Sequence, residues 1–436
     1  MPAEEFVRMD INAICSELRK GAEKLALHTT VQKNHALGCV KQALIEARQD
    51  ILSANAKDVA AARAKNTSEA LVERLALDDK KFDSILSALD VIIAQKDPIG
   101  EEVAGWKAPK GMTIRQVRVP LGVVGIIYES RPNVTVDAFS LAYKSGNAIL
   151  LRGSSSALCS NQAIAVAIRD GLAAAGHDGV KNSFYLCESL SHDDVNQMLT
   201  AVGKIDVILP RGSARLINAV VENAKVPVIQ TGAGVCHMYV DDGGDITIAA
   251  NIAKNAKMQR PGACNAIETV IVNKRIASEF LPVLAKTLNG EVQLRADEVC
   301  FPVLEGALKN CGILPDNENC LVRARPEDFG FEFLDYILAV KTVDSLDEAI
   351  TYINTHNTKH SECIITNNRS HAREFQARVD AACIYVNAST RFTDGGEFGF
   401  GAELGISTQK LHARGPMGIT ALTTTKYLID GDGQIR

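Results

Sequence analysis

One cysteine in this chain lies where a reactive thiol would be displayed. Cys264 follows Pro261 and Gly262, between a predicted amphipathic helix (246–257) and a predicted buried strand (267–272). Because Pro and Gly interrupt the helical pattern, the sulfur is expected on a turn and not inside a core. A thiol displayed in this way is a candidate nucleophile. The alternative for Cys264 taken alone is a small buried apolar side chain, the usual role of a free cysteine.

Two basic segments come directly after predicted buried strands. Arg152 and Ser154 follow one of these strands, and Arg211, Gly212 and Ser213 follow another. Backbone N–H groups at the start of the next helix, together with Arg211, would bind an anion. Arg152 lies where the ribose of a dinucleotide or its 2′-phosphate would lie. Each segment has a simpler alternative, namely a serine that caps a helix next to an ordinary arginine.

Five other polar residues are candidates for contact with a substrate or an intermediate. Arg131 and Asn133 follow the first buried strand, and Asn133 could donate an N–H to an oxyanion or simply cap the next helix. His360 and Glu362 lie at the start of a later strand, and Arg391 lies in a loop beyond it. An ordinary surface position is the simpler explanation for His360, Glu362 and Arg391 taken singly.

The common sequence signatures of nucleotide and metal binding are missing. The chain has neither a GxGxxG fingerprint after a strand nor a Walker loop, and the glycine-rich stretch 399–405 is predicted as a turn. A dinucleotide would therefore have to bind by another route. The eleven cysteines form no CxxC pair and no Cys/His cluster, which predicts reduced thiols and no metal site.

The pattern of apolar residues predicts how these side chains are positioned. Helices are expected in the first hundred residues, among them 11–27 and 31–51, followed by a connection at 98–111. From residue 122 to strand 235–240, short apolar strands alternate with helices, which predicts a doubly wound parallel sheet. A second α/β unit is expected from residue 241 to about residue 387.

Two predicted strands, 113–119 and 423–429, lie outside both α/β units. A lone strand needs a partner, so these two are expected to pair with each other or with another subunit.

Composition excludes some classes of function. The 436 residues carry a net charge of −5, which gives no sign of a nucleic acid or an anionic membrane as partner. The N-terminus lacks the apolar core of a signal peptide, and no apolar run is long enough to span a bilayer. These features predict a cytoplasmic protein.

Several segments, taken together, resemble the aldehyde dehydrogenase superfamily. PLGVVG at 120–125, SGNA at 145–148, GS at 212–213 and the loop of Cys264 follow one another in that family's order. Longer motifs closely resemble the γ-glutamyl phosphate reductase family over almost the whole chain. These motifs are YESRPNVT at 128–135, QRPGACNA at 259–266, HSE at 360–362 and VNASTRFTDGG at 386–396.

The resemblance implies a fold, a reaction and a cofactor. The implied fold is α/β and aldehyde dehydrogenase-like, with a Rossmann-like cofactor domain, an α/β catalytic domain and a small oligomerisation flap. The implied reaction is reduction of L-glutamyl 5-phosphate by NADPH to L-glutamate 5-semialdehyde and phosphate, the second step of proline synthesis from glutamate. A homo-oligomer and a functional association with glutamate 5-kinase are further expectations.

The expected domain boundaries combine the resemblance with the strand pattern. The NADPH-binding domain is expected at 1–111 and 121–242, and the catalytic domain at 243–390. A return segment is expected at 391–418, and oligomerisation strands at 112–120 and 419–436.

The resemblance also implies roles for individual residues. Cys264 would form a thioester, with its own backbone N–H and Asn133 as donors to the oxyanion. Glu332 resembles the glutamate that contacts the nicotinamide ribose. The remaining expectations are cofactor contacts for Arg152, Ser154, Arg211, Gly212 and Ser213, and substrate contacts for Arg131, His360, Glu362 and Arg391.

A hydrolytic, NAD-dependent aldehyde dehydrogenase is the competing interpretation. Such enzymes carry a glutamate general base in a Glu-Leu-Gly-Gly segment. The matching residues here, 230–234, read QTGAG and contain no carboxylate. A reductase that must protect its thioester from water benefits from this lack.

Overall fold

The chain folds into two compact units. The structure is a computed structural model that describes residues 10–177, 180–188, 191–313 and 320–436. Unit 1 runs to Thr231 and includes Phe398–Gly405 and Leu411–Arg436. Unit 2 consists of Gly232–Glu397 and Ile406–Lys410. The expected boundary near residue 242 thus lies about ten residues after the observed change of unit.

Unit 1 is built on a four-stranded parallel sheet in the order β5-β4-β3-β6. Its strands are β3 (Val123–Tyr128), β4 (Ala148–Arg152), β5 (Phe184–Leu186) and β6 (Val207–Arg211). Its helices are α1 (Ile11–Leu25), α2 (Thr30–Glu46), α3 (Arg48–Ala64), α4 (Glu69–Leu75), α5 (Asp79–Ala94), α6 (Asn133–Lys144), α7 (Leu158–Ala175), α8 (His192–Thr200) and α9 (Ala214–Asn223). The predicted alternation of strands and helices from residue 122 is confirmed up to β6.

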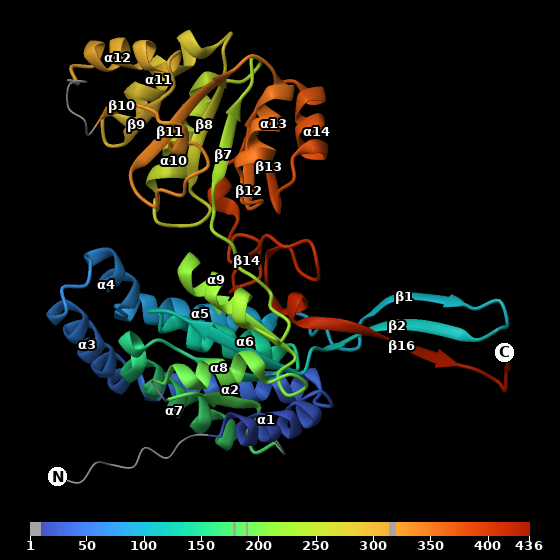
Figure 1. Cartoon of the computed structure of the whole chain (residues 1–436). Coiled ribbons are helices and arrows are strands. Elements are labelled where there is room, and N and C mark those ends of the chain that lie inside the picture. The colour runs from blue at the N-terminus through green and yellow to red at the C-terminus, as the bar shows by residue number, and fades with distance from the viewer. Residues whose placement is uncertain (1–9, 178–179, 189–190, 314–319) are drawn as a thin grey trace. The chain divides into compact units, whose positions relative to one another are not determined.

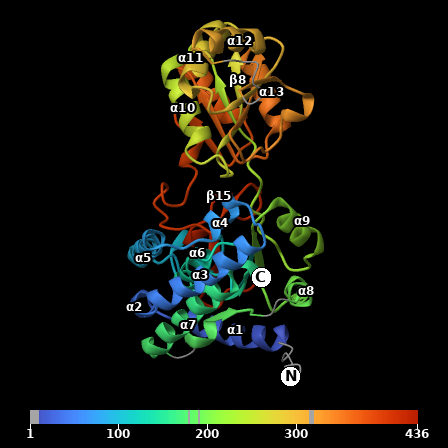
Figure 2. The ribbon, with the colours of Figure 1, turned by 90° about the vertical axis from the view of Figure 1, so that its left-hand side faces the viewer.

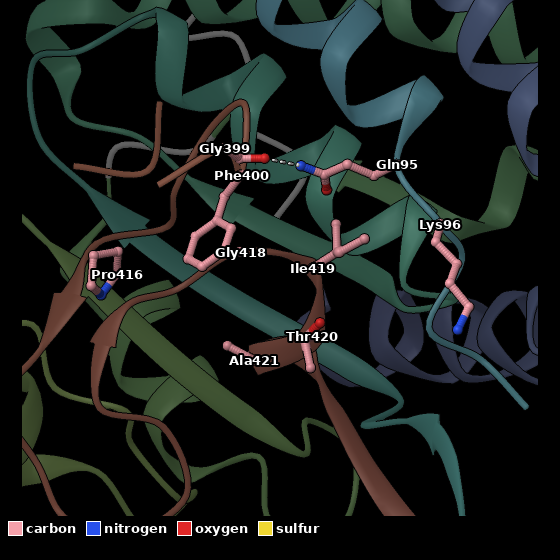
Figure 3. Close-up of a pocket in the computed structure, with 9 residues that line it drawn as sticks. All are labelled: Gln95, Lys96, Gly399, Phe400, Pro416, Gly418, Ile419, Thr420 and Ala421. Atoms are coloured by element: carbon pink, nitrogen blue, oxygen red, sulfur yellow. Dashed lines mark hydrogen bonds between the residues drawn. The ribbon is translucent and has the colours of Figure 1, made fainter. Parts of the chain in front are cut away.

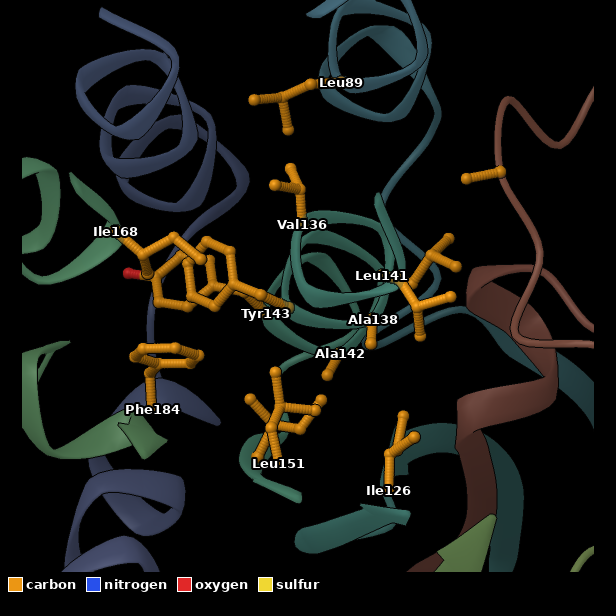
Figure 4. Packing of buried hydrophobic residues seen from close by; sticks show 14 of the residues in the cluster. Leu89, Ile126, Val136, Ala138, Leu141, Ala142, Tyr143, Leu151, Ile168 and Phe184 are labelled. Carbon is orange, nitrogen blue, oxygen red and sulfur yellow. The ribbon is translucent and has the colours of Figure 1, made fainter. Parts of the chain in front are cut away.

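Helices cover both faces of this sheet (Figures 1 and 2). Helix α1 packs with α8 on the face that presents Val123, Ile127 and Leu150. Helices α6 and α7 pack on the opposite face, where Phe139 of α6 meets Phe184 of β5 edge to face at 5.4 Å between ring centroids. Figure 4 shows part of this cluster, including Tyr143 and Phe184. Because both faces are covered, the strands consist almost entirely of apolar residues.

The predicted helix 31–51 is two helices in the structure. Helix α2 ends at Glu46 and α3 begins at Arg48, with Ala47 between them. The sequence has neither Gly nor Pro at this bend, so its periodicity did not reveal the break.

A three-stranded antiparallel sheet, the flap, extends from unit 1 (Figure 1). It consists of β1 (Glu102–Lys107), β2 (Thr113–Pro120) and β16 (Thr423–Asp430) in the order β1-β2-β16. The predicted pairing of the two isolated strands is confirmed, with Thr423 opposite Pro120 and Asp430 opposite Thr113. The prediction of a plain connection at 98–111 is wrong because β1 lies there and pairs with β2.

Unit 2 contains a seven-stranded parallel sheet in the order β10-β9-β11-β8-β7-β12-β13. Its strands are β7 (Cys236–Val240), β8 (Ile267–Asn273), β9 (Gln293–Ala296), β10 (Leu321–Arg323), β11 (Ile337–Val343), β12 (Ser361–Ile365) and β13 (Cys383–Val386). Its helices are α10 (Ile246–Met258), α11 (Ala277–Leu288), α12 (Cys300–Asn310), α13 (Leu346–His356) and α14 (Arg369–Arg378). Unit 2 also contains the two-residue strand β14 (Ile406–Ser407), and unit 1 contains the two-residue strand β15 (Gly415–Pro416).

Strand β7 belongs to this second sheet, whereas the sequence placed it at the end of the first series. It pairs with β8 on one side and β12 on the other. Buried strands of both sheets have the same apolar composition, so composition alone did not show which sheet β7 joins.

Candidate active site

The loop that carries Cys264 connects α10 to β8, as the sequence predicted. Residues 259–266 form turns, and the side chain of Cys264 is partly exposed. Backbone bonds from Ala263 to Arg260 and from Ala266 to Ala263 fix the turns on either side of the thiol. The loop therefore displays the sulfur and does not bury it in the core.

The nucleophile loop lies at the amino ends of neighbouring strands. Gly234 precedes β7, Cys264 precedes β8 and His360 precedes β12, and these three parallel strands are adjacent in the sheet. Gly234 packs so closely that a Cβ atom there would lie 1.5 Å from the carbonyl oxygen of Cys264. Only glycine fits such a contact, so Gly234 is a steric requirement beside the nucleophile loop that the sequence analysis did not identify.

Arg391 holds the nucleophile loop from the other side. Its Nε–H donates to the side-chain oxygen of Gln259 at 3.0 Å, and its Nη1 donates to the side-chain oxygen of Asn265. Burial lowers the pKa of Arg391, and the nearby charge of Arg260 lowers it further, whereas Cys264 acts in the opposite direction. The guanidinium of Arg391 thus lies within electrostatic reach of both Cys264 and Arg260, and Arg260 was not among the predicted site residues.

Glu332 lies close to the thiol through Gly234. Its Oε1 accepts the backbone N–H of Gly234 at 2.6 Å, and Gly234 in turn contacts Cys264. The structure therefore brings together Cys264, Arg391 and Glu332, all of which the sequence analysis had proposed as site residues.

His360 and Glu362 point into the interior. The side chain of His360 is fully buried, and its Nδ1 lies 2.8 Å from the hydroxyl of Ser361. Glu362 is also fully buried, and its Oε2 accepts the backbone N–H and contacts Nδ1 of His237 at 2.8 and 3.1 Å. Burial raises the pKa of Glu362, and the contact with His237 opposes this rise. Glu362 therefore has a buried protein partner in place of the expected substrate contact.

The predicted residues of unit 1 lie at the carboxyl ends of its strands. Ser154, after β4, accepts the backbone N–H of Ser130, after β3, at 3.1 Å. The Nε–H groups of Arg152 and Arg211 are buried and have no hydrogen-bond partner among the described residues. Buried unpaired donors of this kind fit an anionic ligand that would supply the missing acceptors.

The expected anion site at Gly212 and Ser213 is occupied by a side chain of the protein. The carboxylate of Glu129 accepts the backbone N–H of Ser213 at 2.7 Å and its hydroxyl at 3.0 Å. The same hydroxyl caps α9 by accepting the N–H of Leu216, so the alternative prediction of a helix cap by Ser213 is confirmed. The N-terminus of α9 therefore already holds a negative charge, and the cofactor phosphate expected there would compete with Glu129.

Asn133 does not cap the helix that it begins. Pro132 takes the N-cap position of α6, and the amide of Asn133 donates to Asp137 at 2.9 Å. Burial raises the pKa of Asp137 to about 6, although this bond and the charge of Arg211 lower it. Arg131 lies in the same loop, and its carbonyl accepts the N–H of Val134.

A pocket elsewhere in unit 1 contains none of the predicted residues. It is lined by Gln95, Lys96, Gly399, Phe400 and Ile419, among others, and Gln95 donates to the carbonyl of Gly399 at 3.0 Å (Figure 3). The glycine-rich stretch 399–405, predicted as a turn, thus forms part of a pocket wall.

One cluster of possible metal ligands occurs among the described residues, at the carboxyl end of β7. Asp241, Asp242 and His371 have ligand atoms within 4.8 Å of one another. Asp241 already contacts His371 at 2.7 Å and accepts from Thr366 at 2.7 Å, and Asp242 pairs with Arg275 at 3.0 Å. Protein partners therefore account for this cluster.

Comparison with known proteins decides the family. The model of the aldehyde dehydrogenase family matches residues 9–297 and 325–427. The γ-glutamyl phosphate reductase of Clostridium beijerinckii is 50% identical over 414 residues, which cover 94% of this chain and 96% of that protein. The chain belongs to the γ-glutamyl phosphate reductases of the aldehyde dehydrogenase family.

Solved structures of this family have the same fold. The crystal structure of γ-glutamyl phosphate reductase from Thermotoga maritima has a TM-score of 0.91 and 44% identity, and covers 98% of this chain and 100% of that one. A propionaldehyde dehydrogenase from Clostridium phytofermentans, only 17% identical, shares the fold with a TM-score of 0.67 over 98% of this chain and 99% of that one. The predicted aldehyde dehydrogenase-like α/β fold is therefore confirmed. Among the described residues, no helix combines the length and apolar character that crossing a membrane requires.

Proposed function

We propose that this chain catalyses the NADPH-dependent reduction of L-glutamyl 5-phosphate to L-glutamate 5-semialdehyde and phosphate, the second step of proline synthesis from glutamate. The single observation that carries the proposal is the displayed thiol of Cys264, held by Gly234 and Arg391 in a chain of this family. The reaction passes through a thioester on Cys264.

The first step needs a nucleophile and a place for negative charge. The thiolate of Cys264 attacks the acyl carbon, the bond to phosphate breaks, and the phosphate leaves with the electron pair. The guanidinium of Arg391, which is affected by the charges of Cys264 and Arg260, is proposed to stabilise the anionic substrate and the departing phosphate, with Arg260 beside it. The backbone N–H of Cys264 and the amide of Asn133 are the proposed donors to the oxyanion.

The cofactor is proposed to be NADPH. Arg152 and Ser154 at the end of β4 are proposed to hold its 2′-phosphate, because a buried guanidinium N–H without a protein acceptor suits a dianionic group. Glu332 is proposed to contact the nicotinamide ribose near the thiol. When bound, NADPH supplies the hydride that converts the thioester to the aldehyde, and the thiolate is released.

Water must be kept from the thioester. Residues 230–234 contain no carboxylate at the place of the hydrolytic general base. Two other carboxyl groups are near the loop, but Glu332 accepts a backbone N–H and Glu268 is fully buried. This arrangement favours reduction of the thioester, and in the reverse direction transfer of the acyl group to phosphate, over hydrolysis.

The proposed reaction is tested most simply in reverse. The protein is mixed with glutamate 5-semialdehyde, NADP⁺ and phosphate, and NADPH formation is followed by absorbance. The expected result is steady turnover that requires phosphate and also proceeds with arsenate. Turnover at the same rate without either anion would contradict the proposal and would identify a hydrolytic aldehyde dehydrogenase.

The flap is proposed to join two copies of the chain. Trp106, Tyr427 and Ile429 are exposed on it, and a small sheet of this kind gains stability by packing on a partner. Removing the residues after Leu422 deletes β16 and is expected to yield a monomer or an aggregate with low activity. Light scattering that showed an unchanged, active oligomer would contradict this role. Association with glutamate 5-kinase stays a prediction.

A further inference from the structure

A buried ion pair encloses the nucleophile loop. Lys257 is the penultimate residue of α10, and Glu268 is the second residue of β8, so the loop of Cys264 lies between them in the chain. Both side chains are 0% exposed, and Nζ of Lys257 lies 2.5 Å from Oε2 of Glu268. This contact therefore joins the two ends of the segment that displays the thiol.

Stability alone is a poor explanation for this pair, because burying two charges costs free energy. Removing a lysine and a glutamate from water carries a desolvation penalty, and well-packed apolar residues often stabilise such a position equally well. Buried apolar residues lie next to the pair in the chain, namely Ala253 and Ala256 of α10 and Ile267 of β8. A role beyond stability would account for charges at this place.

The second oxygen of Glu268 extends the contact to the site. Its Oε1 accepts the backbone N–H of Leu334 at 3.3 Å. Two residues earlier, Glu332 accepts the backbone N–H of Gly234, which packs on the carbonyl of Cys264. These contacts form a closed ring that starts at the nucleophile loop, passes through Glu268, Leu334 and Glu332, and returns to the loop.

We propose that Lys257 and Glu268 are positioning residues, whose buried contact fixes the thiol of Cys264 relative to the carboxylate of Glu332. The contact holds the two ends of the nucleophile loop together. The hydrogen bond from Leu334 to Glu268 fixes the position of the segment that carries Glu332. The proposal rests on the proposed function in taking Cys264 as the nucleophile. It adds that the reacting sulfur is aligned by two residues that do not touch the substrate.

The pKa shifts of Lys257 and Glu268 show that each charge depends on the other. Burial raises the pKa of Glu268 to about 7, although Lys257 lowers it, and burial lowers the pKa of Lys257. The other titratable groups that act on the pair are Glu332, Asp335 and Cys236. The charges thus depend on each other, and removal of one partner leaves the other buried without its counterion.

The proposal is tested with three variants of the full-length protein. Glu268→Gln keeps the shape of the side chain and removes its charge. The double variant Lys257→Met with Glu268→Gln removes both charges and leaves no unpaired ion, so it decides the question if the single variant does not fold. Asp97→Asn is the matched control, because it breaks another buried lysine–carboxylate pair, Lys33–Asp97, in unit 1.

Two readouts separate positioning from stability. The rate at which iodoacetamide alkylates Cys264 is measured against pH below the melting temperature of each variant, with Cys264→Ser as the blank. The kcat and the KM for NADPH are measured in parallel. Both Glu268 variants are expected to lose kcat by on the order of tenfold to a hundredfold and to change the alkylation profile, since small displacements of reacting groups cost this much. The Asp97 variant is expected to lose stability only.

Either readout can overturn the proposal. Wild-type alkylation and kcat in a folded Glu268 variant, single or double, would show that the pair is only structural. If the wild-type protein showed no reductase activity, the proposed function would fail, and the alkylation profile alone would still decide whether the pair positions the thiol.

Discussion

The two parallel sheets of this protein use opposite edges for their functional residues. In unit 1, Arg152 is the last residue of β4, and Ser154 and Ser213 follow strands and precede helices. In unit 2, Gly234 and Cys264 precede strands, and the thiol lies in the loop that follows α10, which ends at Met258. A helix begins with partial positive charge and ends with partial negative charge, so these two edges have opposite polarity.

The difference explains where cations are needed. At the carboxyl edge of unit 1, backbone N–H groups already favour an anion, and Glu129 occupies one such position. At the amino edge of unit 2, helices end, and the end of a helix does not favour a thiolate or a phosphate. Positive charge is expected to come from side chains there, and Arg391, whose pKa is affected by Cys264 and Arg260, is the proposed source. For the binding of an anion, unit 2 thus depends on individual side chains, whereas unit 1 depends more on its backbone N–H groups.

The first prediction concerns the thiol and has the largest expected effect. Cys264→Ser should reduce turnover by roughly a thousandfold or more, because a serine hydroxyl ionises far less readily than a thiol. NADPH binding and the melting temperature should stay close to those of the wild type. Cys311→Ser, an exposed cysteine of the same unit, is the control and should keep full activity. Normal turnover by the Cys264 variant would rule out the covalent mechanism.

The second prediction tests whether the close packing of Gly234 fixes the position of the Cys264 loop. Gly234→Ala places a Cβ where the carbonyl oxygen of Cys264 lies, so the loop must move. The kcat should fall by on the order of a hundredfold. Gly243→Ala is the matched control, since its Cβ would meet nothing within 4 Å. Equal activity of the two variants would show that the close approach of Gly234 does not matter for catalysis.

The third prediction tests the cation at the edge of unit 1. Arg152→Ala should raise the KM for NADPH roughly tenfold more than the KM for NADH, because only NADPH has the 2′-phosphate. The control is Arg169→Ala on α7. It removes a cation that pairs with Glu188 and should change neither KM. Equal effects of the Arg152 change on both cofactors would place the 2′-phosphate elsewhere.

The fourth and smallest prediction concerns pH and stability. Burial raises the pKa of Asp137 to about 6, so the folded state binds a proton more tightly than the unfolded state. The stability that this group contributes is present below about pH 4 and is lost as the pH rises through 6. Asp137→Asn should therefore gain about 1–2 kcal/mol relative to the wild type between pH 4 and pH 7.5 in urea unfolding. If the free energy of unfolding depended on pH in the same way for the two proteins, the raised pKa of Asp137 would be contradicted.

The sequence predicted those features that depend on local pattern. Pro261 and Gly262 showed that Cys264 lies on a turn, and apolar runs located β3, β4, β6 and β8. The family motifs then supplied the fold and the reaction. Arg391 was predicted as a site residue because its motif resembles the family's, and the structure adds its bonds to the nucleophile loop.

The remaining features depend on contacts between distant parts of the chain. Strand β7 joins the second sheet through pairing with β12, which lies more than a hundred residues later. Glu362 was predicted to contact the substrate, but it is buried, and His237 on the neighbouring strand makes this burial favourable. Glu129 covers Ser213 across 84 residues. No local pattern reports such partners, so these errors arise from tertiary packing.

The thioester on Cys264 is the central claim, and it can be trapped directly. The protein is incubated with glutamate 5-semialdehyde and NADP⁺ without phosphate, and NADPH is measured while peptides are analysed by mass spectrometry. The account predicts a burst of NADPH equal to the number of enzyme sites, a γ-glutamyl adduct on the peptide that contains Cys264, and loss of that adduct when phosphate is added. Continuous NADPH formation without phosphate, with Cys264 unmodified, would contradict it.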